Sequence, residues 1–151
     1  HQERRVLGYS AEQMYELVAN VGEYWQFVPW CSRSAVLSRR GQVLRAELEV
    51  GFPPLLEHYV SEVFLEQPPE RCRVPAQAVG RDCRLFRHLE TLWRFGPGPS
   101  GRTDTCVLDF SVSFEFRSAL HARLAGLFLD EVVKRMVSAF EARAQELFGP
   151  Q

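Results

Sequence analysis

The sequence lacks a long hydrophobic run. None of its apolar stretches approaches the roughly 20 residues that a membrane-spanning helix needs. The first five residues show neither the apolar core of a signal peptide nor a transit-peptide pattern. We therefore expect a soluble chain from which any targeting segment was trimmed or never present.

A surplus of positive charge is also missing. The formal net charge is −1, and Lys, Arg, Asp and Glu are spread along the whole chain. Binding to nucleic acid relies on a basic surface that neutralises phosphates. We therefore expect no nucleic acid among the partners.

Closely spaced cysteines are absent as well. The chain has four cysteines and no CxxC pair: Cys31, Cys72, Cys83 and Cys106. This spacing argues against a zinc site and against a small disulfide scaffold. We expect buried or half-buried thiols in a reducing compartment. Cys31 has no visible His partner, which favours an inert thiol over a nucleophile.

The common catalytic motifs are not found: there is no GxSxG, no P-loop and no GxGxxG after a strand. His88 and Glu90 share one strand face, but no second His or Cys stands at ligand spacing, so we expect a surface or hydrogen-bonded pair. The other histidines are isolated: His1, His58 and His121. We assign no metal and no cofactor. An enzyme is not excluded, because catalytic groups come together in space rather than in sequence.

Apolar and aromatic side chains are plentiful instead. The chain of 151 residues is 46% apolar and contains eleven Phe and three Trp. Its length suits one domain over residues 1–151 that can bury a core. These side chains either fill that core completely or enclose a cavity, and composition alone does not choose between the two.

The first half of the chain predicts a strand, a helix and then further strands. Residues 4–9 form a short strand, and Ser10 with Gln13 makes a capping box at the start of a helix. Residues 20–30 are rich in aromatics and predict a short second helix or a turn. Residues 42–50 then alternate, and one face of this strand carries Leu44, Ala46, Leu48 and Val50.

The second half continues the meander. Strands are predicted at residues 55–66, 84–95 and 104–116, the last with Phe110 and Phe114 on its apolar face. Residues 71–79 contain Pro75, which cannot donate to a ladder, so this segment is an edge, bulged or broken strand. Helical periodicity extends from residue 118 to about residue 148, before Gly149 and Pro150.

The long predicted helix has two apolar surfaces. One stripe faces the core and comprises Ala122, Leu129, Val133, Met136, Val137, Phe140, Ala144 and Leu147. In its first turns the opposite side is apolar too, with Leu120, Leu124, Leu127 and Phe128. A neighbouring loop or a dimer contact could cover this side, or it could be a ligand mouth or a membrane-docking patch. The apolar loop at residues 52–56 is a second candidate for the same surface.

Several segments resemble one known family. They are YWQFVPWC at 24–31, LEVGFPP at 48–54, LFRHLETLWRF at 85–95, DFSVSFEFR at 109–117 and DEVVKRMVSAF at 130–140. Together they resemble the mitochondrial coenzyme Q-binding protein family of the START-like, polyketide-cyclase-like superfamily, in the right order over nearly the whole chain. Asp82 with Cys83, in place of an Asp-Gly turn, and Pro75 depart from the family pattern and affect only the strand and loop around them.

The resemblance implies an α+β helix-grip fold, in which a curved antiparallel sheet wraps a long C-terminal helix around an apolar cavity. It further implies a hydrophobic tunnel for ubiquinone or another polyisoprenoid quinone and no catalytic turnover. The implied role is that of a lipid chaperone supporting respiration and quinone biosynthesis. The implied location is the matrix side of the mitochondrial inner membrane, bound peripherally, with the membrane surface and quinone-biosynthesis proteins as partners.

Inward strand faces and the helix stripe give the expected tunnel residues: Phe27, Trp30, Leu48, Trp93, Phe110, Phe114, Val133, Met136 and Phe140. The expected mouth, which would dock at the bilayer, comprises Phe52, Leu55, Leu120, Leu124, Leu127 and Phe128. One alternative is a cyclase or aromatase of the same fold, which would need His88, Glu90 or Tyr59 to face inward. The other is an interaction module related to bacterial ribosome-association proteins, for which a basic surface would be expected.

Overall fold

The structure is a computed structural model that describes residues 1–51, 56–66, 72–79, 86–127 and 129–150, with the backbone alone at 72, 73, 78 and 79. Its elements in chain order are β1 (Gln2–Leu7), α1 (Ala11–Ala19), the 3-10 helix η1 (Val21–Gln26), β2 (Cys31–Arg40), β3 (Val43–Val50), β4 (Glu57–Phe64), β5 (Cys72–Val79), β6 (Phe86–Pro97), the 3-10 turn η2 (Pro99–Gly101), β7 (Cys106–Phe116), α2 (Ala119–Gly126) and α3 (Leu129–Phe148).

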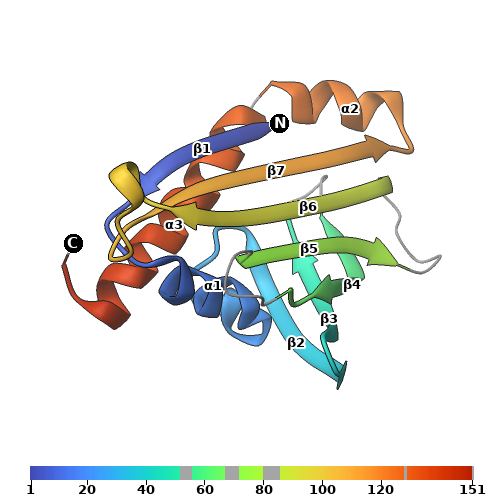
Figure 1. The fold of residues 1–151 in the computed structure, drawn as a ribbon. Helices are drawn as coiled ribbons and strands as arrows, with labels where there is room; N and C mark the ends of the chain where they lie inside the picture. Colours follow the sequence, from blue (N-terminus) through green and yellow to red (C-terminus); the bar gives the residue numbers. More distant parts are fainter. Residues whose placement is uncertain (52–55, 67–71, 80–85, 128, 151) are drawn as a thin grey trace.

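All seven strands form one antiparallel sheet in the order β1-β7-β6-β5-β4-β3-β2. The sheet is strongly bent, so that β2 and β3 run across the direction of β6 and β7 (Figure 1). The C-terminal helix α3 passes behind β1 and β7 in this view. The predicted α+β helix-grip architecture is therefore confirmed.

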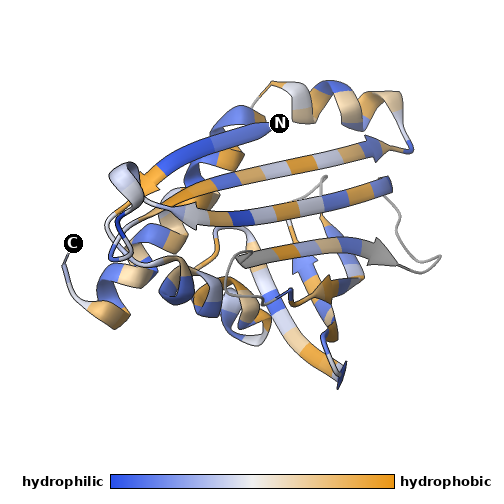
Figure 2. Ribbon diagram, in the orientation of Figure 1, coloured by the Kyte–Doolittle hydropathy of each residue, from blue (hydrophilic) through white to orange (hydrophobic). Residues whose placement is uncertain are grey.

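The core lies between the inner face of the sheet and the helices α1 and α3. Successive side chains of a strand point to opposite faces of the sheet, and hydropathy alternates along β7 (Figure 2). On the strands the buried apolar side chains include Leu44, Ala46, Leu48, Val63, Val74, Trp93, Phe95, Cys106, Leu108 and Phe110. They meet Val133, Val137, Phe140 and Ala144 of α3 and Met14 and Val18 of α1.

The capping box predicted for α1 is present. The Gln13 backbone N–H donates to Ser10 Oγ at 3.1 Å, and the Ser10 backbone N–H donates to Gln13 Oε1 at 3.0 Å. These two bonds satisfy donors that the first helical turn leaves without a partner inside the helix. They fix the point at which the chain leaves β1 and enters α1.

Replacing Ser10 by Ala is expected to lower the free energy of unfolding by about 1 kcal/mol, because the N-cap acceptor is lost. Urea unfolding followed by circular dichroism measures this change. Ser38→Ala, at an exposed position of β2, is the matched control and should leave the midpoint in place. Equal midpoints for the two variants would contradict a stabilising role of the cap.

The strand that contains Pro75 is not an edge strand. β5 lies between β4 and β6, so the edge interpretation was wrong. On the β6 side Pro75 is opposite Leu92. On the β4 side the ladder stops at the pair Val63 and Ala76, one residue short of Pro75. A proline is tolerated here because it stands just beyond the end of the β4–β5 ladder, where its missing N–H costs no bond to β4.

The single long helix predicted at the C-terminus is also wrong, because two helices occupy this segment. α2 ends at Gly126 and α3 begins at Leu129, and α2 lies beside β7, away from the axis of α3 (Figure 1). Glycine costs about 1 kcal/mol relative to Ala inside a helix, so the break falls where helix propensity is lowest. Asp130 and Glu131 occupy the first turn of α3, where negative charge favours a new N-terminus.

The C-terminal end of α3 was predicted correctly. The helix ends at Phe148, and Gly149 adopts a φ of 87° while its N–H donates to Gln145 O at 3.0 Å. This is the left-handed cap for which glycine is favoured. Over the described ranges, none of the helices has the length and apolar character needed to cross a bilayer.

Candidate functional site

A cavity of about 100 Å³ lies inside the protein between the sheet and α3. Its walls come from η1, from β2 to β7 and from α3. The described lining residues are Val21, Tyr24, Val28, Cys31, Leu48, Val50, Tyr59, Ser61, Val63, Val74, Ala76, Thr91, Trp93, Phe110, Met136 and Phe140. None of these side chains is charged at neutral pH, so the cavity suits an uncharged, largely apolar ligand.

Three aromatic rings form the wall where the sheet meets α3. The ring centroid of Trp93 lies 4.3 Å from that of Phe110 and 4.7 Å from that of Phe140. Trp93 and Phe110 are opposite each other on β6 and β7, which places both rings on the inner face. The cavity therefore persists beside a tightly packed aromatic cluster rather than in a loose core.

One side of the cavity is closed by η1 and the residues that follow it. Phe27 packs edge-on against Phe140 at 4.9 Å, and the guanidinium of Arg143 lies over the Phe27 ring at 5.2 Å. Arg143 also donates to Gln26 Oε1 at 3.0 Å. These contacts hold η1, whose Val21 and Tyr24 line the cavity, against α3.

Two lining residues with titratable side chains are kept protonated. Burial raises the pKa of Tyr24, and its hydroxyl donates to the carbonyl of Val18. Burial also raises the pKa of the Cys31 thiol, whose Sγ donates to Arg33 O at 3.5 Å. A thiol with a raised pKa is a poor nucleophile. The interpretation of Cys31 as a buried thiol is therefore confirmed.

The predicted tunnel residues fall into two sets. The structure brings together Leu48, Trp93, Phe110, Met136 and Phe140 as cavity lining. The remaining predictions do not line it: Phe27, Trp30, Phe114 and Val133. Phe27 packs behind Phe140, and Val133 is buried in the core. Trp30 is half-buried at the junction of η1 and β2, where it adopts a positive φ of 59°.

Phe114 belongs to a second aromatic cluster. Its ring centroid lies 5.2 Å from Phe116 and 6.3 Å from Phe86, at the end of β7 from which α2 follows. It was placed in the tunnel because it shares the inner face of β7 with Phe110. The two residues are four positions apart, so about 13 Å of strand separates them, and the cavity ends before Phe114.

Sequence reasoning missed the polar part of the lining. Ser61 is only 4% exposed, and Thr91 is half-buried in the neighbouring part of the sheet. Both occupy inward-facing positions of their strands, β4 and β6, where an apolar residue is expected. A polar residue at an inward position was the signal that could have identified them.

Only part of the predicted mouth lies within the residues that the structure describes. Leu120 and Leu127 of the α2 region are 63% and 82% exposed, whereas Leu124 is half-buried. In α2 only Ala125 is buried. Phe52, Leu55 and Phe128 lie outside the described residues. Among the residues that the structure describes, none covers these two leucines.

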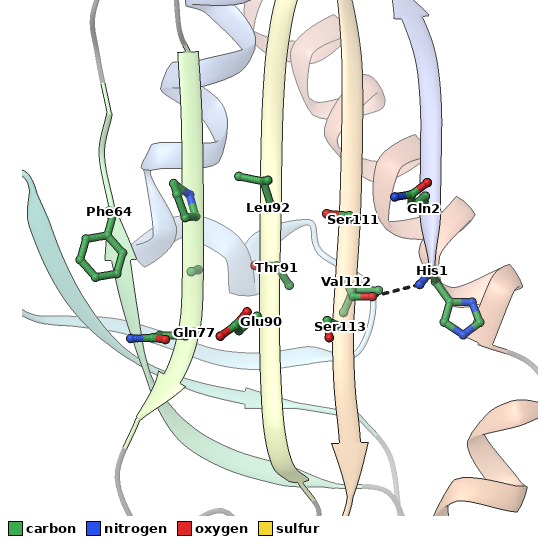
Figure 3. A pocket seen from close by; sticks show the side chains of 12 residues that line it. His1, Gln2, Phe64, Gln77, Glu90, Thr91, Leu92, Ser111, Val112 and Ser113 are labelled. Atoms are coloured by element: carbon green, nitrogen blue, oxygen red, sulfur yellow. Dashed lines mark hydrogen bonds between the residues drawn. The ribbon is translucent and has the colours of Figure 1, made fainter.

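A larger groove of about 490 Å³ lies on the other face of the sheet. Figure 3 shows Gln77, Glu90 and Ser113 at this groove, on β5, β6 and β7. It opens where the β4–β5 ladder ends, and Phe64 and Pro75 form part of its lining. His88 and Glu90 are both exposed, with His88 Nε2 3.8 Å from Glu90 Oε2. Their predicted outward placement as a surface pair is confirmed.

Comparison with known proteins identifies the family to which this chain is similar. A family model described as polyketide cyclase / dehydrase and lipid transport matches residues 7–141. A Xenopus laevis relative, coenzyme Q-binding protein COQ10 homolog B, mitochondrial, is 58% identical over 151 residues, which are 100% of this chain and 60% of the relative. The chain thus spans about 60% of that relative's length.

Two further relatives are shorter and are covered more fully. Coenzyme Q-binding protein coq10, mitochondrial, of Schizosaccharomyces pombe is 33% identical over 93% of this chain and 84% of its own length. The ribosome association toxin RatA of Rickettsia prowazekii is 27% identical over 97% of this chain and 96% of its own length.

Among solved structures, an aromatase/cyclase from a Streptomyces species superposes with a TM-score of 0.81 at 14% identity, covering 96% of this chain and 92% of the other. At this identity the likeness concerns the fold alone. The family match and the identities to the Xenopus and Schizosaccharomyces proteins go further. The chain belongs to the polyketide cyclase / dehydrase and lipid transport family and, within it, to the coenzyme Q-binding proteins.

Proposed function

We propose that this protein binds ubiquinone in the cavity between the sheet and α3 and carries it to and from a membrane. The observation that carries the proposal is an uncharged cavity walled by Trp93, Phe110 and Phe140, in a chain 58% identical to a protein named for coenzyme Q binding. Each buried CH₂ of a polyisoprenoid tail contributes about 0.8 kcal/mol. Apolar walls therefore supply most of the affinity.

The cavity is smaller than the ligand that it is proposed to hold. Pockets for drug-sized ligands usually measure about 300–1,000 Å³, against about 100 Å³ here. A single ring can enter this space after a modest displacement of its walls, but a long isoprenoid tail must extend beyond it. The tail route that we propose runs along the inner face of β6 and β7, past Leu89 and Val112 to Phe114 and α2.

This route ends at the surface that we propose to meet the bilayer. Leu120 and Leu127 are exposed there, and the sequence from Arg117 to Leu129 contains two arginines, one histidine and no acidic residue. A helix with exposed leucines and basic neighbours suits the interface of an anionic membrane, where each basic side chain contributes about 1 kcal/mol. Docking by α2 would let the tail pass between tunnel and lipid without crossing water.

The proposed place of action follows from the relatives. The Xenopus and Schizosaccharomyces proteins are named mitochondrial. We propose the matrix side of the mitochondrial inner membrane, with ubiquinone held as a chaperoned lipid for the respiratory chain and for enzymes of quinone biosynthesis. In this role the protein catalyses no reaction.

The two alternatives have less support. An enzyme of the cyclase type would need acid–base groups in the cavity, whereas His88 and Glu90 are exposed on the opposite face and only Tyr59 of that set lines it. The RatA relative would favour an interaction module. A ribosomal partner would be expected to select a basic surface, and the net charge of −1 does not provide one.

The direct test is organic extraction and mass spectrometry of the protein purified from a host that makes ubiquinone. We expect ubiquinone near one molecule per chain. The same protein should accelerate the movement of ubiquinone from donor to acceptor vesicles. Absence of lipid, or a mixture of phospholipids in place of quinone, would contradict the proposal.

A further inference from the structure

Resting on the proposed function, we propose that the hydroxyls of Ser61 and Thr91 bind the oxygen atoms of the ligand's uncharged ring and so form the head-group site. Both residues line the cavity, Ser61 on β4 and Thr91 on β6. Between them lies Ala76 of β5, a small residue that also lines the cavity. We call these three lining residues the floor of the cavity and propose that the ring lies on it.

The two hydroxyls have no hydrogen-bond partner among the described residues. Within the part of the chain that the structure describes, neither Ser61 Oγ nor Thr91 Oγ1 forms a hydrogen bond. Ser61 is nevertheless 4% exposed. A hydroxyl that faces the cavity without a protein partner can donate a hydrogen bond to an acceptor that a ligand brings.

The other polar groups of the lining are already engaged. Tyr24 donates to the carbonyl of Val18, Cys31 donates to that of Arg33, and Tyr59 has an interaction of its own. The buried carboxylate of Glu57 accepts bonds from the backbone N–H groups of His58 and Phe86 and does not line the cavity. Ser61 and Thr91 therefore offer a ligand two hydroxyl donors that the described residues do not engage.

The spacing of the two residues is comparable to the length of a hydrogen-bonded para-quinone. Ser61 is opposite Ala78 and Thr91 is opposite Ala76, so the two residues are two strands apart and offset by two positions. This places their Cα atoms about 10 Å apart across the sheet and about 7 Å along it, or about 12 Å in total. A quinone with carbonyl oxygens about 5 Å apart and a hydrogen bond of about 2.8 Å at each end spans about 11 Å. A ring with its two hydrogen bonds is therefore of the same length as the separation of the two Cα atoms, which is consistent with one ring lying between the two side chains.

The same lining explains which head groups are rejected. No described lining residue is Lys, Arg, His, Asp or Glu. A carboxylate or a phosphate would enter without a counter-charge, and burial of an unpaired charge is strongly unfavourable. Fatty acids and phospholipids are therefore excluded from the floor, whereas a neutral ring rich in oxygen is accepted.

The test compares two ligands that share an isoprenoid character but differ in their heads. Ubiquinone-2 carries the ring, and squalene is a hydrocarbon without oxygen. Binding is followed through quenching of the intrinsic tryptophan fluorescence, to which Trp93 of the cavity lining contributes together with Trp25 and Trp30. For ubiquinone-2 we expect Ser61→Ala and Thr91→Val each to raise the Kd by about two- to tenfold. Squalene should bind these variants as it binds the wild type.

Matched variants separate the hydroxyl from the shape of the side chain. Thr91→Ser keeps the hydroxyl and should retain wild-type affinity, whereas Thr91→Val keeps the shape and should not. Equal weakening for ubiquinone-2 and squalene, or no weakening for either, would overturn the head-group assignment while leaving quinone binding intact. Failure of the wild type to bind ubiquinone-2 at all would overturn the proposed function as well.

A measurement on the wild type alone guards against variants that fail to fold. Hydrogen bonds to a quinone lower the stretching frequency of its carbonyl groups. The infrared difference spectrum of bound ubiquinone-2 should show this downward shift relative to the ligand in hydrocarbon solvent. Carbonyl bands at the hydrocarbon-solvent position would overturn the assignment.

Discussion

Replacing Met136 by Asp is expected to abolish the retention of ubiquinone by protein purified from a quinone-producing host. Met136 is half-buried on α3 and lines the cavity. A carboxylate at this position would have to lose its hydration when a ligand enters, and no described lining residue offers a counter-charge. We expect affinity to fall by about 100-fold or more, which corresponds to about 2.8 kcal/mol.

Two control variants accompany this change. Met136→Leu conserves volume and apolar character, so it should retain the quinone. Ala142→Asp introduces the same charge at an exposed position of α3 and should also retain it. Circular dichroism and the unfolding midpoint establish that each variant folds. Ubiquinone recovered in normal yield from folded Met136→Asp protein would remove this residue, and with it the cavity, from the proposed site.

Replacing Leu120 and Leu127 together by Ser is expected to slow the transfer of ubiquinone between vesicles while leaving its retention unchanged. These leucines are the exposed apolar side chains of the α2 region and do not line the cavity. If insertion of each contributes about 1.5 kcal/mol, the double variant should partition to the membrane about 100-fold less. Vesicle sedimentation measures binding, and extraction with mass spectrometry measures retention.

The matched control removes two leucines from other parts of the surface. Leu37 on β2 and Leu147 on α3 are 53% and 52% exposed, and neither belongs to α2. The double variant Leu37→Ser with Leu147→Ser should bind vesicles as the wild type does. If both double variants lost the same affinity, the membrane contact would not be specific to α2.

Much of the fold could be predicted because its determinants are local. The alternation of Leu44, Ala46 and Leu48 identified β3 and its inner face, and all three side chains are buried. The capping box located the start of α1, and Gly149 located the end of α3. Each of these signals depends on residues a few positions apart, so a single sequence contains it.

The errors arose where distant contacts decide the outcome. The periodicity of residues 118–148 runs through Gly126 without interruption, but α2 packs beside β7 instead of continuing α3. Pro75 argued for an edge strand, yet the position at which the β4–β5 ladder stops depends on how β4 and β5 pair, which are separate segments of the chain. Neither the helix break nor the central position of β5 can be predicted from the residues of a single helix or strand.

The site was predicted in part for the same reason. Trp93, Phe110 and Phe140 were found because inward alternation and helical periodicity place them on facing surfaces. The volume left between them depends on how the sheet bends and how Phe27 packs, which no pattern in the sequence expresses. Ser61 and Thr91 were overlooked because apolar residues were sought, although their inward positions marked them as exceptions.

The break between α2 and α3 separates two physical properties of the C-terminal segment. α3 buries Val133, Val137, Phe140 and Ala144 in the core, whereas α2 buries only Ala125. Substitutions on the outer side of α2 therefore change surface chemistry at little cost in folding free energy. The outer surface of α2 can accordingly change its chemistry while the cavity between the sheet and α3 keeps its shape.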